Sequence, residues 1–160
     1  MFCYQRNFGC PTEIVSQQQF WALIKAPRTV DLVREAREAL ALGDKKTYDA
    51  KKKRLPFVIF IATYIETVSA SGKLGCWRKQ AACRLNGLCV IDFDHINGDV
   101  REVWAEAYSL LSDEDKARVL LVYITPSGHG LKVVFIADPQ YNLIDNRRFL
   151  QRSSEARSSV

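Results

Sequence analysis

The segment LCVIDFDHINGD, residues 88–99, places two aspartates at the end of an apolar run. Residues 88–94 are almost continuously apolar and rich in β-branched side chains, which predicts a buried strand at the centre of a sheet. Asp92 and Asp94 are two positions apart, so a strand places both side chains on the same face. A strand that only had to fold would bury apolar side chains there, and the acid pair therefore indicates a functional site.

Asp92 and Asp94 form the predicted catalytic and metal-binding pair. Two carboxylates this close repel one another, and a divalent cation relieves that repulsion. Mg²⁺ or Mn²⁺ takes hard oxygen ligands and keeps waters that the phosphates of a substrate can replace. Bound in this way, such ions stabilise the attacking and leaving oxygens of phosphoryl transfer. The alternative is that the two acids only form a turn or a cap at the end of a strand.

A second motif, PSGHGLK at residues 126–132, connects two further predicted strands. Its glycines permit positive φ and close backbone approach, so that N–H groups can face an anion. A serine hydroxyl and a lysine ammonium add polar contacts for phosphate oxygens. The motif therefore predicts a nucleotide-binding set, with the lysine also counted as catalytic: Ser127, Gly128, His129, Gly130 and Lys132. The alternative is a hairpin connection with a surface lysine.

The order of elements around these motifs predicts the fold class. A strand at 88–94 is followed by a helix at 100–111, and strands at 118–125 and 131–137 form a hairpin. The first connection is long enough for a crossover helix. Strand–helix–strand–strand is the order of ferredoxin-like and RRM-like sheets, so the expected class is α/β (α+β) with flanking helices.

Patterns upstream of residue 88 predict a helical lead-in and a strand. Helical spacing, caps and turn residues predict helices at 12–25 (capped by Thr12), 29–43 (capped by Thr29), 44–54 and 76–86. The β-branched and aromatic run at 57–66 predicts a strand or a strand pair. Residues 69–73 have the composition of a turn.

With 160 residues, the chain has the usual size of one domain. We therefore expect a single domain over 1–160. It would comprise a mostly helical lead-in at 1–54, the sheet with both motifs at 55–137, and a helical tail with a frayed end at 138–160. We also expect the natural protein to continue beyond Val160, which would make this chain the N-terminal part of a longer one.

The chain carries a net charge of +5, which permits a polyanionic partner without requiring one. Four consecutive cations are the predicted nucleic-acid-binding residues: Lys51, Lys52, Lys53 and Arg54. The alternative is a solvated helix face. No apolar run reaches the roughly 18 residues that span a bilayer, and the N-terminus lacks the order of a signal peptide. These patterns predict a cytoplasmic protein with no membrane partner.

The motifs VIDFDH and TPSGHGLKVVF resemble the first two motifs of archaeo-eukaryotic primases and primase-polymerases. Over residues 50–137 the chain is more similar still to the VirE-type N-terminal domain of mobile-element and phage-like proteins. The resemblance implies that Asp92 and Asp94 bind the metal, and it aligns the family's phosphate-side histidine with Lys132. It also implies that a helicase-like ATPase is a partner in mobile-element or phage replication.

A third acidic motif of that family is not evident in the chain. Asp138 and Asp145 are available, but Asp138 precedes a proline at a strand end and Asp145 lies in a predicted helix. The expected function is metal-dependent nucleotidyl transfer of the DNA primase-polymerase type, from nucleoside triphosphates on a DNA or RNA template. One alternative is a non-catalytic nucleic-acid-binding or replication-accessory module. Another is a Toprim-like nuclease that uses Glu66 with the acid pair, and a third is a plain interaction domain.

Overall fold

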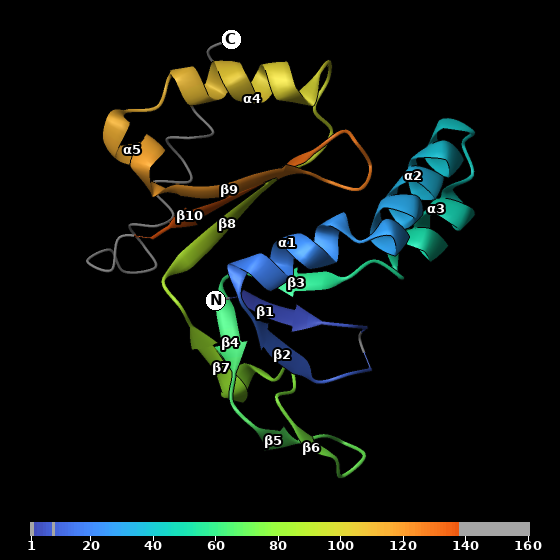
Figure 1. Ribbon diagram of the computed structural model, residues 1–160, viewed down its shortest axis with the longest axis vertical. Coiled ribbons are helices and arrows are strands. Elements are labelled where there is room, and N and C mark those ends of the chain that lie inside the picture. The colour runs from blue at the N-terminus through green and yellow to red at the C-terminus, as the bar shows by residue number, and fades with distance from the viewer. Residues whose placement is uncertain (1, 8, 138–160) are drawn as a thin grey trace.

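The computed structural model describes residues 2–7 and 9–137 (Figure 1). The described chain is a mixed α/β protein with several small antiparallel sheets. Its helices are α1 (Gln17–Lys25), α2 (Pro27–Ala41), α3 (Lys45–Lys52), α4 (Val100–Ser109), α5 (Asp113–Arg118) and the short 3-10 helix η1 (Gln80–Ala82). Its strands are β1 (Phe2–Gln5), β2 (Thr12–Val15), β3 (Phe57–Ile59), β4 (Ala62–Tyr64), β5 (Thr67–Val68), β6 (Leu74–Gly75), β7 (Cys83–Leu85), β8 (Leu88–Phe93), β9 (Val119–Ile124) and β10 (Leu131–Ile136).

Strands β8, β10 and β9 form the sheet that carries both sequence motifs, in that order. Both pairings are antiparallel, so β8 and β9 run parallel to each other on either side of β10. The predicted central position of β8 is therefore wrong: β10 is central, and β8 is an edge strand of this sheet. The apolar residues of β8 are half-buried, because α4 and α5 lie on one side of the sheet and α1 lies on the other (Figure 1).

The core that joins the two halves of the chain is largely aromatic. Its buried members are Phe2, Val15, Phe20, Phe60, Leu121 and Val134. The ring of Phe20 lies edge-on to those of Phe2 and Phe60, with centroids 5.3 and 5.6 Å away. Such edge-to-face pairs add to the stabilisation from apolar burial. Because Leu121 and Val134 belong to β9 and β10, this core fixes one face of the main sheet against α1 and β1.

The N-terminal segment corrects the predicted helix at 12–25. Thr12–Val15 is strand β2, paired with β1, and the Thr12 hydroxyl donates to the carbonyl of Cys76. The helix begins only after Ser16, whose hydroxyl accepts from the N–H of Gln19. The Ser16 N–H in turn donates to the side-chain oxygen of Gln19, which completes a capping box. The expected lead-in at 1–54 is helical from residue 17 onward, but it begins with two strands.

Removal of this cap gives a measurable loss of stability. Ser16→Ala leaves the N–H of Gln19 without its side-chain acceptor. We expect the free energy of unfolding to fall by about 1 kcal/mol, the usual cost of losing a serine cap. Urea denaturation followed by circular dichroism measures the change, and Gln18→Ala, at an exposed position of the same helix, serves as a control that should stay within about 0.5 kcal/mol. Equal losses in the two variants would contradict the capping role.

Helices α2 and α3 form a hairpin that confirms the predicted helices at 29–43 and 44–54. Helix α2 starts earlier than expected, at Pro27, so Thr29 is not its cap. Gly43 has a φ of 74°, which suits glycine at the turn, and Asp44 caps α3 through the N–H of Thr47. The two helices pack through Ala36, Ala39 and Tyr48.

Several short elements were misread or missed in the sequence. The predicted helix at 76–86 is wrong: the segment is extended apart from η1, and it ends in β7, which pairs with β4. The run at 57–66 is a strand pair, because Phe60 and Ile61 separate β3 from β4. The turn at 69–73 joins β5 to β6. Helix α5 was not expected, and the predicted tail at 138–160 lies outside the described residues.

The expected strands at 88–94, 118–125 and 131–137 and the helix at 100–111 are confirmed as β8, β9, β10 and α4. Among the helices in the described part of the chain, none has the length and apolar character needed to cross a bilayer.

Candidate metal and nucleotide site

A polar row crosses the main sheet at one end of the face that packs on the aromatic core. The β-ladder places Lys132 of β10 directly between Asp92 of β8 and Tyr123 of β9. One step further into the core, the equivalent row is apolar and consists of Val90, Val134 and Leu121. The sheet therefore brings together the first acid of one motif and the lysine of the other, on one face.

Lys132 and Asp92 form an ion pair, with 2.6 Å between the lysine Nζ and the carboxylate Oδ2. Their side chains are 34% and 44% exposed. A partly exposed pair of this kind contributes only about 0 to 1 kcal/mol, since water screens it and two flexible side chains must be held in place. The pair neutralises one acid of the site, yet it is weak enough to exchange for a stronger ligand.

Asp94 lies just beyond the end of β8, beside Gly130, which lies just before the start of β10. A Cβ added to Gly130 would lie 2.8 Å from the Thr125 hydroxyl oxygen and 3.3 Å from the Asp94 Oδ1. It would also lie 2.6 Å from the backbone oxygen of Phe93. Only glycine fits here, because these three oxygens crowd the position that a Cβ would occupy. Oxygen donors of this type suit a hard divalent cation.

The loop at 126–130 is held by its own hydrogen bonds. Gly128, at a φ of 83°, donates its N–H to the Thr125 carbonyl, and the His129 N–H donates to the Ser127 hydroxyl. The Ser127 and Thr125 hydroxyl oxygens are 3.0 Å apart. Two of the N–H groups expected to face an anion therefore already have acceptors within the loop. The backbone oxygen of His129 accepts from Ile96, which ties this loop to the turn after Asp94.

Tyr123 is a member of the site that sequence reasoning missed. Its ring packs on the aromatic core, 6.0 Å from the ring of Phe60. Burial, and secondarily the charge of Asp92, raise the pKa of its hydroxyl far above the usual value, so the group stays a neutral phenol at physiological pH. Only the alternation of residues along β9 could have placed it on the acid-bearing face.

Arg37 is a second missed residue, and it comes from helix α2. Its Nε and Nη2 atoms donate to the carbonyls of Pro126 and Thr125, at 3.2 and 3.3 Å. These bonds link α2 to the glycine-rich loop across 88 and 89 residues of sequence. No local pattern signals such a contact, because it depends on how the helical hairpin packs against the sheet.

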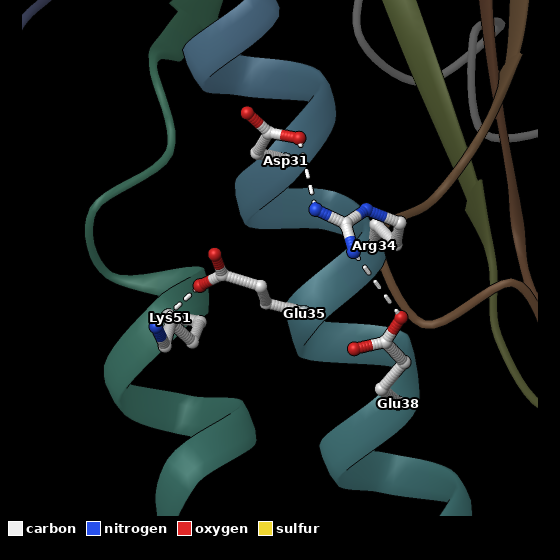
Figure 2. A network of polar contacts seen from close by, with 5 residues as sticks. All are labelled: Asp31, Arg34, Glu35, Glu38 and Lys51. Carbon is white, nitrogen blue, oxygen red and sulfur yellow. Dashed lines mark hydrogen bonds and ion pairs between the residues drawn. The ribbon is translucent and has the colours of Figure 1, made fainter.

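The predicted nucleic-acid-binding run at 51–54 is divided by the fold. Lys51 forms an ion pair with Glu35 of α2, and its ammonium lowers the pKa of that carboxyl (Figure 2). The Lys52 ammonium lies 5.6 Å from the centroid of the Tyr48 ring. Lys53 and Arg54 instead line a cleft beside β1. The run is therefore part solvated helix face and part cleft lining.

Further acids do not complete a three-residue metal cluster within residues 2–7 and 9–137. Glu66 is exposed and follows β4, which pairs with β7 and belongs to a different sheet from β8. It therefore does not join Asp92 and Asp94 as the nuclease alternative requires. Asp138 and Asp145 lie outside the described residues.

The fold and this polar row define a small mixed α/β domain whose antiparallel sheet carries an acid–lysine site. The chain belongs to the family described as BT4734-like, N-terminal domain, because the model of that family matches residues 50–158. The matched segment contains the main sheet and both motifs. Searches of curated proteins and of solved structures find no significant match.

This family assignment corrects the resemblance drawn from the motifs. The matching family is a different one from the VirE-type N-terminal domain and the primases, so that assignment is wrong. The motifs VIDFDH and SGHGLK are short, and much of their composition reflects the strand ends and the hairpin that they form. Patterns of this kind arise in unrelated sheets, which is why they misidentified the family.

Proposed function

We propose that this domain binds a nucleoside triphosphate together with Mg²⁺ or Mn²⁺ and transfers the nucleotidyl group to a nucleic-acid end, as a DNA primase-polymerase does. The observation that carries the proposal is the placement of Asp92, Asp94 and Lys132 on one face at one end of the sheet. Gly130 adds to this support, because its lack of a side chain lets the Asp94 carboxylate and the Thr125 hydroxyl lie close to the backbone at the same point.

The two acids have the chemistry that a divalent cation needs. Asp92 and Asp94 project from the same face of β8 and its end, and both are exposed. Lys132 lies 2.6 Å from the Oδ2 of Asp92, and that carboxylate is partly exposed. When bound, Mg²⁺ or Mn²⁺ would act as a Lewis acid on the phosphate oxygens. The Thr125 hydroxyl oxygen lies near the Asp94 carboxylate, beside Gly130.

Lys132 holds the second part of the proposed site. In the absence of nucleotide it pairs with Asp92, and its half-exposed side chain can turn toward a triphosphate once a cation neutralises that acid. Ser127 and His129 lie in the adjoining loop, which Arg37 secures to α2.

In the transfer itself, a hydroxyl oxygen of the nucleic acid bonds to the α-phosphorus. The bond to the bridging oxygen breaks, pyrophosphate leaves, and the hydroxyl proton passes to solvent.

We also propose that the segment from β8 to β10 is the RRM-like or ferredoxin-like unit expected from the sequence. Two parallel strands joined by α4 and α5, with a third antiparallel strand between them, form a split β-α-β unit. A ferredoxin-like sheet contains two such units. This part of the proposal is a topological interpretation, and the function rests on the side chains instead.

A second candidate function is a non-catalytic nucleic-acid-binding or replication-accessory module. The ion pair between Lys132 and Asp92 favours it, because an acid already neutralised by lysine has less need of a metal. The lack of a third acid beside the pair, within the described residues, favours it as well. The nuclease alternative has less support, since Glu66 lies between β4 and β5, outside the sheet of β8, and forms no three-acid cluster among the described residues.

Calorimetric titration of nucleoside triphosphate in the presence and absence of Mn²⁺ tests the proposal. We expect Mn²⁺ to raise nucleotide affinity at least about tenfold, a coupling within the usual range for two linked ligands. A primed template and labelled triphosphates then test for extension products. Nucleotide binding that ignores Mn²⁺ would overturn the metal site, and coupled binding without any product would favour the accessory module. Cleavage of DNA without added nucleotide would favour the nuclease.

A further inference from the structure

A basic cleft lies where strand β1, the start of α2 and the segment after α3 meet. It encloses about 490 Å³, which is within the usual size range of ligand sites. Four cations line it: Arg6, Arg28, Lys53 and Arg54. None of the described residues that line the cleft is acidic. These cations come from three segments that are far apart in the sequence, so only the fold assembles them.

These cations differ from the others on the same pair of helices. On α2, Arg34 pairs with Asp31 and Glu38, while Glu35 pairs with Lys51 of α3 (Figure 2). Within the described part of the chain, the four cations of the basic cleft make no ion pair with a carboxylate. All four are exposed. Their charges therefore repel one another around one hollow, and an anion bound there would relieve that repulsion.

Stability of the fold accounts for only part of this arrangement. Lys53 and Arg54 directly follow the end of α3, where the helix dipole favours cations. Arg28 occupies the first turn of α2, where the helix dipole disfavours a cation. The position of Arg28, together with the lack of carboxylates among the described lining residues, points to an anionic ligand.

The rest of the lining indicates which anion fits. The half-buried ring of Tyr4 and the apolar side chains of Leu23 and Leu32 form part of the wall. Cations beside an aromatic and apolar surface suit a phosphate with an unpaired base attached, because such a base can stack on the ring. A base in a duplex is already stacked on its neighbours and cannot do so.

We infer that the basic cleft binds the backbone of single-stranded nucleic acid, with phosphates beside Arg6, Arg28, Lys53 and Arg54 and one base against Tyr4. The inference supplies the nucleic-acid partner of the proposed nucleotidyl transfer. It keeps Lys53 and Arg54 from the predicted run and adds Arg6 and Arg28, which no local pattern indicated. It needs neither metal nor nucleotide, so it can hold or fail separately from the proposed function.

Fluorescence anisotropy with a labelled oligothymidylate of about 12 nucleotides, in EDTA and without nucleotide, tests this inference. The test variant is Arg6→Gln with Arg28→Gln. The matched control is Lys45→Gln with Lys46→Gln, which removes the same charge from exposed positions at the start of α3, outside the cleft lining. We expect the test variant to bind at least about tenfold more weakly and its salt slope to fall by about 1.4, as two phosphate contacts are lost. The control should stay within about twofold.

Several outcomes would overturn the inference. Equal weakening in both variants would mean that net charge alone attracts the strand, and no weakening in either would place binding elsewhere. Displacement of the oligonucleotide by polyglutamate at equal charge would show an unspecific polyanion surface. Tight binding of free inorganic phosphate or mononucleotide, without binding of the strand, would assign the cleft to a small anion. Thermal unfolding of each variant confirms that the fold is retained, which the exposure of all four substituted side chains leads us to expect.

Discussion

Asp92→Asn combined with Asp94→Asn is expected to weaken Mn²⁺-dependent nucleotide binding by at least about a hundredfold, because both carboxylates of the proposed metal site are lost. Loss of residues that only support metal ligands already costs about 10- to 100-fold, so loss of the ligands themselves should reach the upper end. The asparagines keep the size of the side chains, and both positions are exposed, so the fold should persist. Calorimetric titration of nucleotide with and without Mn²⁺ measures the effect.

Glu66→Gln is the matched control for this double variant. It removes an exposed carboxylate in the connection between β4 and β5, outside the main sheet, so nucleotide binding should change by less than about twofold. If Glu66→Gln removed Mn²⁺ coupling as fully as the double variant, the nuclease-like set of three acids would be favoured. If the double variant kept wild-type coupling, the proposed metal site would be excluded.

Gly130→Ala is expected to lower the free energy of unfolding by about 3 kcal/mol, the upper end of the usual cost of overpacking. The new methyl group would lie 2.6 Å from the backbone oxygen of Phe93 and 2.8 Å from the buried hydroxyl of Thr125. A backbone oxygen in a β-ladder cannot move aside cheaply, so β8 and β10 must separate at this point. Urea denaturation monitored by circular dichroism gives the change in midpoint at constant slope.

Gly9→Ala provides the comparison for this effect. Its added methyl group would meet the Asn7 side-chain oxygen at 3.4 Å, an ordinary contact with a side chain that can adjust. We expect a change within about 0.5 kcal/mol. A Gly130→Ala variant as stable as Gly9→Ala would mean that the hairpin has more room than its geometry indicates, and the argument for a required glycine at Gly130 would fail.

The main sheet was predictable because its signals are local. The apolar run at 88–93, the helix after it and the hairpin at 119–136 are each encoded within a few residues, and their order leaves few ways to pair the strands. The same pairing brought Lys132 opposite Asp92, so the candidate site followed from two motifs and one register. Which strand lay at the centre did not follow, since a continuous apolar run also suits an edge strand whose two faces are both partly covered.

The other members of the site depend on tertiary contacts that no local pattern encodes. Arg37 reaches the glycine-rich loop from another helix, and Tyr123 joins the site only through the register of β9 with β10. Strand β2 was mistaken for part of a helix because Thr12 can serve as a cap, whereas the structure uses its hydroxyl to bind the Cys76 carbonyl. The segment at 76–86 was mistaken because its spacing looked helical, although pairing with β4 decides its conformation.

The edge position of β8 carries a consequence for solubility. Among the described strands, β8 pairs with β10 only, so its outer side presents backbone groups that a strand of another molecule could recognise. Charged side chains on an edge strand oppose such association, and Asp92 lies at the end of this one. The carboxylates proposed to hold a metal therefore also oppose aggregation through this edge strand. Variants that neutralise them are expected to aggregate more readily at high protein concentration.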